Sequence, residues 1–250
     1  MVTGYASSLR FLLLGLILAA LSWPIHVPTA LAQQMDVDLE LVLAADGSGS
    51  IDDGELALQR DGYAEAIADP EILTLIQGGL TGRIAVAYVE WGGPFSQHTI
   101  VDWTVIDGAE SAAAFGRSLR AAPRQATGYN SISNAIDYSV TMMETNRYDG
   151  LRRIVDVSAD GPNIGGRPIT AARDEAVSKG VTINALLVLH REGGLPGWDP
   201  EELVGHYERD VIGGFGAFVM TVNENRTFAE AVRAKMILEV ARALGLEDRL

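Results

Sequence analysis

Three polar side chains alternate with glycines in the segment Asp46-Gly47-Ser48-Gly49-Ser50. Glycine lets the backbone curl tightly, so a carboxylate and two hydroxyls at alternate positions can converge on one point. Oxygen ligands without imidazole or thiolate suit a hard cation such as Mg²⁺, Mn²⁺ or Ca²⁺. We therefore predict a divalent cation site built on Asp46, Ser48 and Ser50.

Other sites can be built from the same segment. Residues 44–55 resemble an EF-hand calcium loop, but its first position would be Ala44 and the preceding segment is predicted to be a strand rather than a helix. A phosphate-binding loop would need a lysine that is missing here, and a serine-hydrolase elbow would need glycine in place of Asp46. A polar turn that caps the next helix remains the plain structural alternative.

Two further segments place oxygen ligands at comparable positions. Asp160-Gly161 follows an apolar segment at 153–158, which puts a second carboxylate at a strand end. The polar loop that begins at Thr127 and runs through Asn130 and Ser131 leads into an apolar-striped helix. A site made only of oxygen needs several loops to converge, and the sequence provides three.

Hydrophobic periodicity predicts one alternating α/β unit. The alternation of strands and helices implies a doubly wound, mostly parallel six-stranded sheet with helices on both faces. The one direct strand-to-strand step, from 83–91 to 97–105, predicts a hairpin and one antiparallel edge strand. The loops at 91–94 and after residues 45 and 158 then lie at the carboxyl edge, where ligands bind in such sheets. The expected strands are 37–45, 83–91, 97–105, 153–158, 181–189 and 217–222, and the expected helices are 53–68, 109–121, 131–146, 169–179, 199–211 and 227–244.

These motifs resemble a von Willebrand factor type A (vWA) domain with a metal-ion-dependent adhesion site. That family has Asp-x-Ser-x-Ser after its first strand, a Thr in a second loop and an Asp-Gly after a later strand. Asp46, Ser48 and Ser50 match the first element, and Asp160-Gly161 matches the third. The resemblance covers 33–250 as a single vWA-like domain and is closest to an exported bacterial branch of unknown function.

The second loop departs from the family pattern. Alignment on Ala135-Ile136 places Asn130 where the family has Thr, and Thr127 and Ser131 are the alternatives. The resemblance implies that Ser48, Ser50 and the second-loop residue bind the metal directly, and that Asp46 and Asp160 act largely through water. It also implies Mg²⁺ as the main candidate, with Mn²⁺ or Ca²⁺ as alternatives, and an open position for a partner's Asp or Glu.

The first 32 residues are typical of a secretory signal peptide. Arg10 precedes an apolar run at 11–21, and Ala30-Leu31-Ala32 forms a small-residue cleavage site. The run is too short to span a bilayer of about 30 Å, although an uncleaved anchor is the alternative. We expect export to a periplasm or beyond, with no stable membrane insertion after cleavage.

Composition narrows the function further. The formal charge is −14, and −15 once Arg10 is removed, which argues against nucleic acid as a partner. The absence of cysteine excludes a thiolate zinc site, a disulfide scaffold and a cysteine nucleophile. We expect a metal-dependent protein-binding module rather than an enzyme. The rivals are a metal-assisted hydrolase with Asp160 as its base and a small-solute binder, which would usually need two lobes.

Overall fold

The computed structural model describes residues 34–189, 198–222 and 227–246. The predicted signal peptide at 1–32 lies outside the described residues. From Gln34 onward the chain forms one compact unit.

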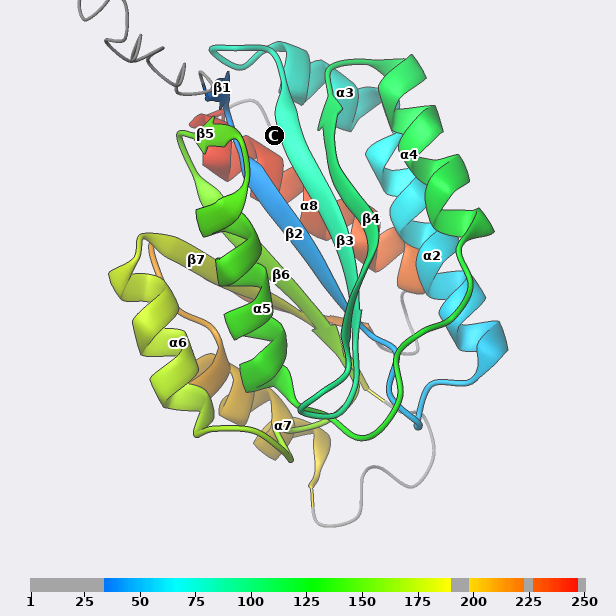
Figure 1. The fold of residues 1–250 in the computed structure, drawn as a ribbon, viewed down its shortest axis with the longest axis vertical. Coiled ribbons are helices and arrows are strands. Elements are labelled where there is room, and N and C mark those ends of the chain that lie inside the picture. Colours follow the sequence, from blue (N-terminus) through cyan, green and yellow to red (C-terminus); the bar gives the residue numbers. More distant parts are fainter. Residues whose placement is uncertain (1–33, 190–197, 223–226, 247–250) are drawn as a thin grey trace, which may run out of the picture. The chain divides into compact units, whose positions relative to one another are not determined.

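A six-stranded sheet runs through this unit in the order β4-β3-β2-β6-β7-β8 (Figure 1). All neighbouring strands are parallel except β3 and β4, which pair in antiparallel fashion at one edge. The predicted fold class is therefore confirmed. The strands are β2 (Glu40–Asp46), β3 (Ile84–Trp91), β4 (Gln97–Ile106), β6 (Arg153–Ala159), β7 (Val181–Val188) and β8 (Val219–Val222).

Helices cover both faces of the sheet. One face carries α2 (Asp53–Ile67), α3 (Pro70–Gln77), α4 (Ala109–Ala121) and α8 (Phe228–Leu244). The other carries α5 (Ile132–Thr145), α6 (Ile169–Ser178) and α7 (Pro200–His206), which continues into a π-helical turn, η2 (Tyr207–Val211). Within the described ranges, no helix is both long and apolar enough to cross a membrane.

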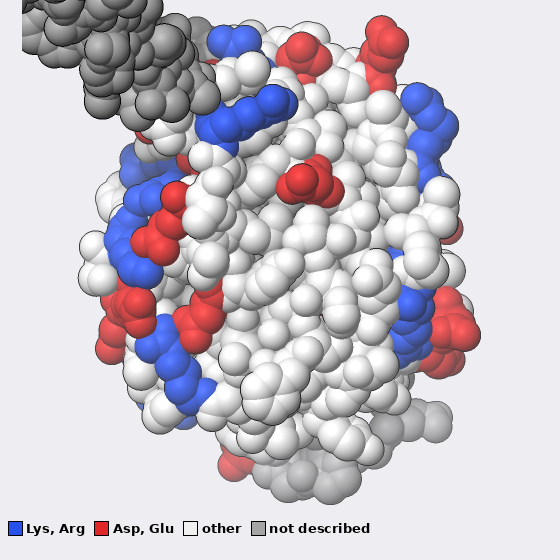
Figure 2. Space-filling model, viewed as in Figure 1, with Lys and Arg blue, Asp and Glu red and all other residues white. Residues whose placement is uncertain are grey.

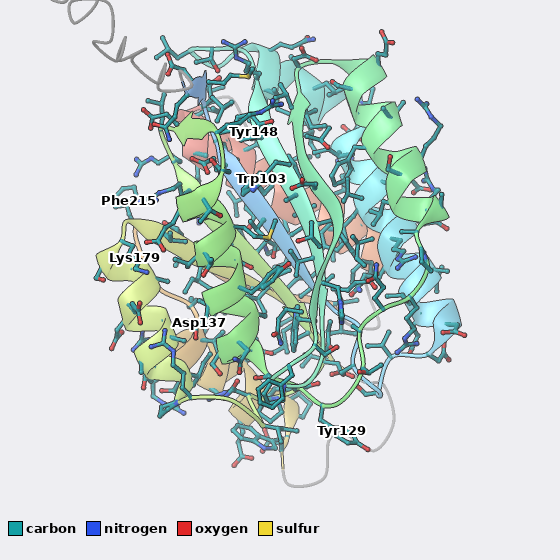
Figure 3. The ribbon with its side chains drawn as sticks, in the orientation of Figure 1. Trp103, Tyr129, Asp137, Tyr148, Lys179 and Phe215 are labelled. Atoms are coloured by element: carbon teal, nitrogen blue, oxygen red, sulfur yellow. The ribbon has the colours of Figure 1, made fainter. Side chains whose placement is uncertain are left out.

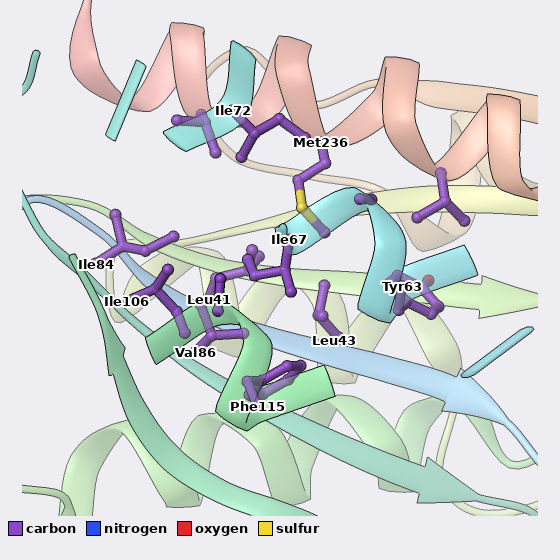
Figure 4. Packing of buried hydrophobic residues seen from close by; sticks show 14 of the residues in the cluster. Leu41, Leu43, Tyr63, Ile67, Ile72, Ile84, Val86, Ile106, Phe115 and Met236 are labelled. Atoms are coloured by element: carbon purple, nitrogen blue, oxygen red, sulfur yellow. The ribbon is translucent and has the colours of Figure 1, made fainter. Parts of the chain in front are cut away.

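The strand β2 shows how the sequence divides between the two layers. Leu41 and Leu43 pack into the cluster under α2, α4 and α8, whereas Val42 and Ala44 pack under α5. Alternate side chains of a strand point to opposite faces, so a strand buried on both sides must be apolar throughout. Figure 4 shows the first cluster, in which Ile67, Phe115 and Met236 close over Leu41 and Leu43.

Three short elements were not predicted. The expected strand at 37–45 divides into β1 (Met35–Val37) and β2, and β1 pairs in parallel with β5 (Tyr148–Gly150). Tyr148 lies against Trp103 of β4, with ring centroids 6.1 Å apart (Figure 3). The third is α3, in which Asp69 caps the helix and Pro70 begins it.

A cluster of charged and polar side chains is buried beneath α8. Lys235 forms ion pairs with Asp156 of β6 and Glu239 of its own helix, and the Asn184 amide donates to Glu239 at 2.8 Å. All four side chains are almost fully buried. Burial, followed by the charge of Asp156, raises the pKa of Glu239 to about 7. One lysine thus faces two carboxyl groups. We call these four residues (Asp156, Asn184, Lys235 and Glu239) the buried ion cluster.

This raised pKa makes stability depend on pH in a defined direction. The folded protein holds the Glu239 proton more tightly than the unfolded chain, whose pKa is near 4.5. The resulting stabilisation is present below pH 4.5 and is lost as the pH rises through 7. We expect Glu239→Gln to remove this dependence. Between pH 5 and pH 8 the free energy of unfolding of the wild type should therefore fall, relative to that of the variant, by up to about 3 kcal/mol. Urea unfolding at both pH values tests this; a constant difference between the two proteins would contradict it.

Candidate functional site

The candidate site lies where the order of the strands reverses. β2 pairs with β3 on one side and with β6 on the other. The chain then continues from β2 into a helix on one face and from β6 into a helix on the opposite face. Such a divergence leaves a crevice at the carboxyl ends of the strands. Asp46 ends β2, Asp160 directly follows β6, and Asn130 lies on the loop that leads into α5.

The Asp-x-Ser-x-Ser segment forms a tight turn at the end of β2. The Ser48 backbone N–H donates to Oδ1 of Asp46 at 2.7 Å. The hydroxyl of Ser48 lies 3.0 Å from that of Ser50. Ser48 is fully buried, whereas Ser50 is exposed. The three side chains therefore converge, as their spacing predicts.

Asn130 joins this group from the second loop. The Ser48 hydroxyl donates to Oδ1 of Asn130 at 2.9 Å, and the Asn130 amide donates to Oδ1 of Asp160 at 3.4 Å. The two alternatives lie differently. The Thr127 side chain is exposed, and the hydroxyl of Ser131 donates to Asn134 and to the Gly165 carbonyl. The structure thus gathers Asp46, Ser48, Ser50, Asn130 and Asp160, and turns Ser131 toward another loop.

The two carboxyl groups of the site are in an unfavourable environment. Asp46 and Asp160 are each 1% exposed. Burial, reinforced by the charge of Asp160, raises the pKa of Asp46 to about 7. Oδ2 of Asp46 is buried and has no hydrogen-bond partner among the described residues. Tyr207 lies beside Asp160: its hydroxyl donates to the carbonyl of the next residue, Gly161, at 2.6 Å.

This donor set fits a hard divalent cation. Two buried carboxyl groups repel each other, and a buried acceptor without a partner is costly, so both features favour a positive charge at this point. Ser48, Ser50 and Asn130 add neutral oxygens of the type that Mg²⁺ and Ca²⁺ accept. Among the described residues, no three His, Cys, Asp or Glu side chains group as metal ligands. A site here would therefore depend on its hydroxyl and amide oxygens.

The EF-hand alternative for residues 44–55 is wrong. An EF-hand loop is entered from a helix, whereas residues 40–46 form the central strand β2. The expected first ligand position is Ala44, which is fully buried in the core under α5. Asp52 and Glu55, which would be later ligands, form a capping box at the start of α2 instead.

Two residues that the sequence analysis did not identify hold the turn in place. The Arg124 guanidinium donates to the carbonyls of Gly47, Ser48 and Ile51 at 2.8–3.1 Å. Gln59 of α2 donates to the Asp46 carbonyl at 3.0 Å. Arg124 lies more than 70 residues from the turn, so no local sequence pattern indicates this contact.

A substitution of Arg124 tests whether cation binding depends on the hydrogen bonds that hold the turn. Nη2 of Arg124 donates to the three carbonyls while Nη1 pairs with Asp53. Lysine keeps the positive charge but has one nitrogen, which cannot hold the carbonyls and Asp53 together. We expect Arg124→Lys to weaken divalent cation binding about fivefold, because the turn must then be ordered by the ion itself. Arg120→Lys is the matched control, since Arg120 pairs with Asp61 on the surface. Equal affinities of the two variants in calorimetric titration would refute the role of Arg124.

Comparison with known proteins identifies both a family and a fold. The family described as "Protein of unknown function (DUF1194)" matches residues 36–244. No curated protein matches the sequence.

Several solved structures resemble this one. The von Willebrand factor type A protein from Catenulispora acidiphila is 14% identical (TM-score 0.56) and aligns over 84% of this chain and 43% of its own. Proximal thread matrix protein 1 from the mussel byssus has a zinc-occupied metal-ion-dependent adhesion site (MIDAS) motif. It is 14% identical (TM-score 0.56) and aligns over 81% of this chain and 46% of its own. The vWF domain of the type V pili tip protein Mfa5 from Porphyromonas gingivalis is 10% identical (TM-score 0.54) and aligns over 83% of this chain and 96% of its own.

The chain spans less than half the length of the first two of these proteins. Identities of 10–14% establish a shared fold and nothing more specific. The fold is that of von Willebrand factor type A domains, as the sequence motifs implied.

Proposed function

The chain belongs to the DUF1194 family of unknown function, and from its own site we propose that it is an exported, metal-dependent protein-binding module. Asp46, Ser48, Ser50, Asn130 and Asp160 would hold a divalent cation, with Mg²⁺ the main candidate. The bound cation would supply a positive charge with a coordination position open to a carboxylate of the partner. In this proposal the protein binds its partner and catalyses no reaction.

The observation that carries the proposal is the convergence of five oxygen-bearing side chains from three loops. They include two buried carboxyl groups, with one oxygen of Asp46 lacking a partner in the described structure. A folded protein does not usually bury like charges together without compensation. Three of the five side chains are neutral, so the cation would keep much of its charge for an external ligand. The matrix protein and the pilus tip protein among the structural neighbours agree with this type of function.

Export supports the same proposal. The predicted signal peptide would deliver the chain to a compartment where divalent cations are available. The mature protein would carry a charge of about −15, and an acidic chain repels an acidic partner at a distance. Binding of such a partner would then depend on the cation and weaken without it.

Cation-dependent capture tests the proposal. The mature chain, immobilised, is incubated with the periplasmic fraction or the culture medium of the cells that produce it, in Mg²⁺ or in EDTA. We expect a specific protein to be retained in Mg²⁺ and released by EDTA, and not to be retained by Asp46→Asn. Retention that is the same in EDTA and on the variant would refute the proposal.

A metal-assisted hydrolase is the competing function. It would need a general base near the cation, and Asp160 is the candidate from the sequence. Assays on phosphoester and peptide substrates, with Mg²⁺ and with EDTA, distinguish the two functions. Turnover that disappears both in EDTA and in Asp160→Asn would show that the protein is a hydrolase and would refute the proposal of binding alone.

A further inference from the structure

Large apolar side chains are exposed on the loops that form the site. Phe95, Tyr129 and Ile164 are 101%, 72% and 67% exposed. They lie on three different loops: the one between β3 and β4, the one that precedes α5, and the one that follows β6. Figure 3 shows Tyr129 at the lower end of the molecule, on its loop and pointing away from the sheet. We call these three side chains the apolar rim.

Backbone hydrogen bonds join these loops to one another and to Asn130. The Gly93 N–H donates to the Thr127 carbonyl at 2.8 Å, which ties the Phe95 loop to the Tyr129 loop. The Ile164 N–H donates to the Asn130 carbonyl at 2.7 Å, and Tyr129 directly precedes Asn130. The rim therefore stands on the backbone that carries a predicted metal ligand, and its position is fixed by that backbone.

The fold gives no reason for apolar residues at these positions. At such exposure the side chains contribute little to the core, and a polar residue would be accommodated equally well. On the face shown in Figure 2, charged side chains gather along the flanks, over α6 and over α2 and α4. The surface over β4 and α5, down to the end where the site loops lie, is largely uncharged. Large apolar side chains exposed on loops that are joined in this way are typical of a binding surface.

We propose that the apolar rim recognises a partner loop in which one Asp or Glu is flanked by aromatic or aliphatic side chains. This inference rests on the proposed function, because the acidic residue is the one that would reach the cation. Aromatic side chains bury roughly 150–250 Å² each and dominate many interfaces. Their contact would also exclude water, and a charge pair is stronger where water is excluded.

Peptide selection tests this inference on the mature protein. A phage-displayed library of random peptides is bound to the immobilised chain in Mg²⁺ and eluted with EDTA. The rim variant combines Phe95→Ser, Tyr129→Ser and Ile164→Ser. The matched control combines Leu58→Ser, Leu80→Ser and Leu151→Ser, which change side chains that are 64–84% exposed on α2 and on two other loops.

The wild type and the control should enrich peptides with an acidic residue beside apolar ones. The rim variant should keep the acidic residue and lose the apolar preference. A peptide selected on the wild type should bind the rim variant about tenfold more weakly, with an unchanged Kd for Mg²⁺.

Three other results would overturn the inference, and each has a different meaning. If EDTA elutes acidic peptides without apolar enrichment, or equally apolar peptides from the rim variant, only the rim is refuted. If sedimentation shows a wild-type dimer that the rim variant abolishes, the rim binds a second copy of the chain instead. If EDTA elutes the same peptides from wild type and Asp46→Asn, the proposed function itself fails, and the inference fails with it.

Discussion

Asp46→Asn should abolish divalent cation binding and leave the protein folded. The variant keeps an oxygen that can accept the Ser48 N–H, so the turn at the end of β2 retains its hydrogen bond. It removes one of the two charges that the cation would neutralise. We expect the affinity for Mg²⁺, Mn²⁺ and Ca²⁺ to fall by at least about 100-fold, because hard cations depend on charged oxygen ligands.

The same substitution should not destabilise the metal-free protein, and we expect a small gain in stability. Asp46 and Asp160 lie buried together, and an uncharged amide ends the repulsion between them. A residue that costs stability in the free protein and is needed for binding is typical of a functional site. Loss of binding combined with unchanged or raised stability would distinguish this role from a merely structural one.

Calorimetric titration of the three ions measures the affinity, and thermal unfolding with and without Mg²⁺ gives an independent readout. A ligand at 100 times its Kd stabilises the folded state by about 2.7 kcal/mol, so the wild type should gain a clear increase in Tm and the variant none. Asp174→Asn is the matched control, since Asp174 is an exposed acid that pairs with its neighbour Arg173. Equal heats for the wild type and Asp46→Asn would refute the metal site.

Local sequence patterns predicted the parts of the structure that depend on neighbouring residues. The helix at 109–121 has the predicted bounds, since Ala122 is extended directly before Pro123 and ends it. Asp46, Ser48 and Ser50 converge because alternate positions on a glycine turn face the same side. The helix α3 carried a readable signal as well, in Asp69 and Pro70, and was still not predicted.

Contacts between distant segments could not be predicted in the same way. Alignment placed Asn130 first in the second loop but left Thr127 and Ser131 open. Which of the three faces Ser48 depends on how that loop packs against Gly47 and Gly49, and only the fold fixes that packing. The role of Arg124 in holding the turn depends on the same packing. The pairing of β1 with β5 joins segments more than 100 residues apart.

The helix at 227–244 was predicted, but its charged residues show a second limit of prediction from one sequence. An apolar stripe identifies the buried face of a helix, and charged residues are then expected to face water. Lys235 and Glu239 are nevertheless buried, because Asp156 of β6 provides a partner for the lysine. A single sequence does not show which buried charge will find such a partner.

Lys235→Met should therefore destabilise the protein severely. The substitution preserves much of the side-chain volume but leaves Asp156 and Glu239 buried together without a positive charge. Breaking a buried ion pair by removing one partner costs about 3–5 kcal/mol, and we expect a loss of this size at pH 8. The loss should be smaller at pH 5, because burial already raises the pKa of both carboxyl groups and their protonation relieves the repulsion.

Urea unfolding at pH 5 and pH 8 measures this effect, and the chain provides a matched control in its other lysine. Lys179 pairs with Glu144 and Glu175 at the surface, so Lys179→Met should change the free energy of unfolding by no more than about 1 kcal/mol. Adding Asp156→Asn and Glu239→Gln to Lys235→Met should restore most of the stability, because no buried charge then remains unpaired. A cost below about 1 kcal/mol for Lys235→Met at pH 8 would mean that the buried ion cluster reaches water, and that its charges are solvated rather than paired.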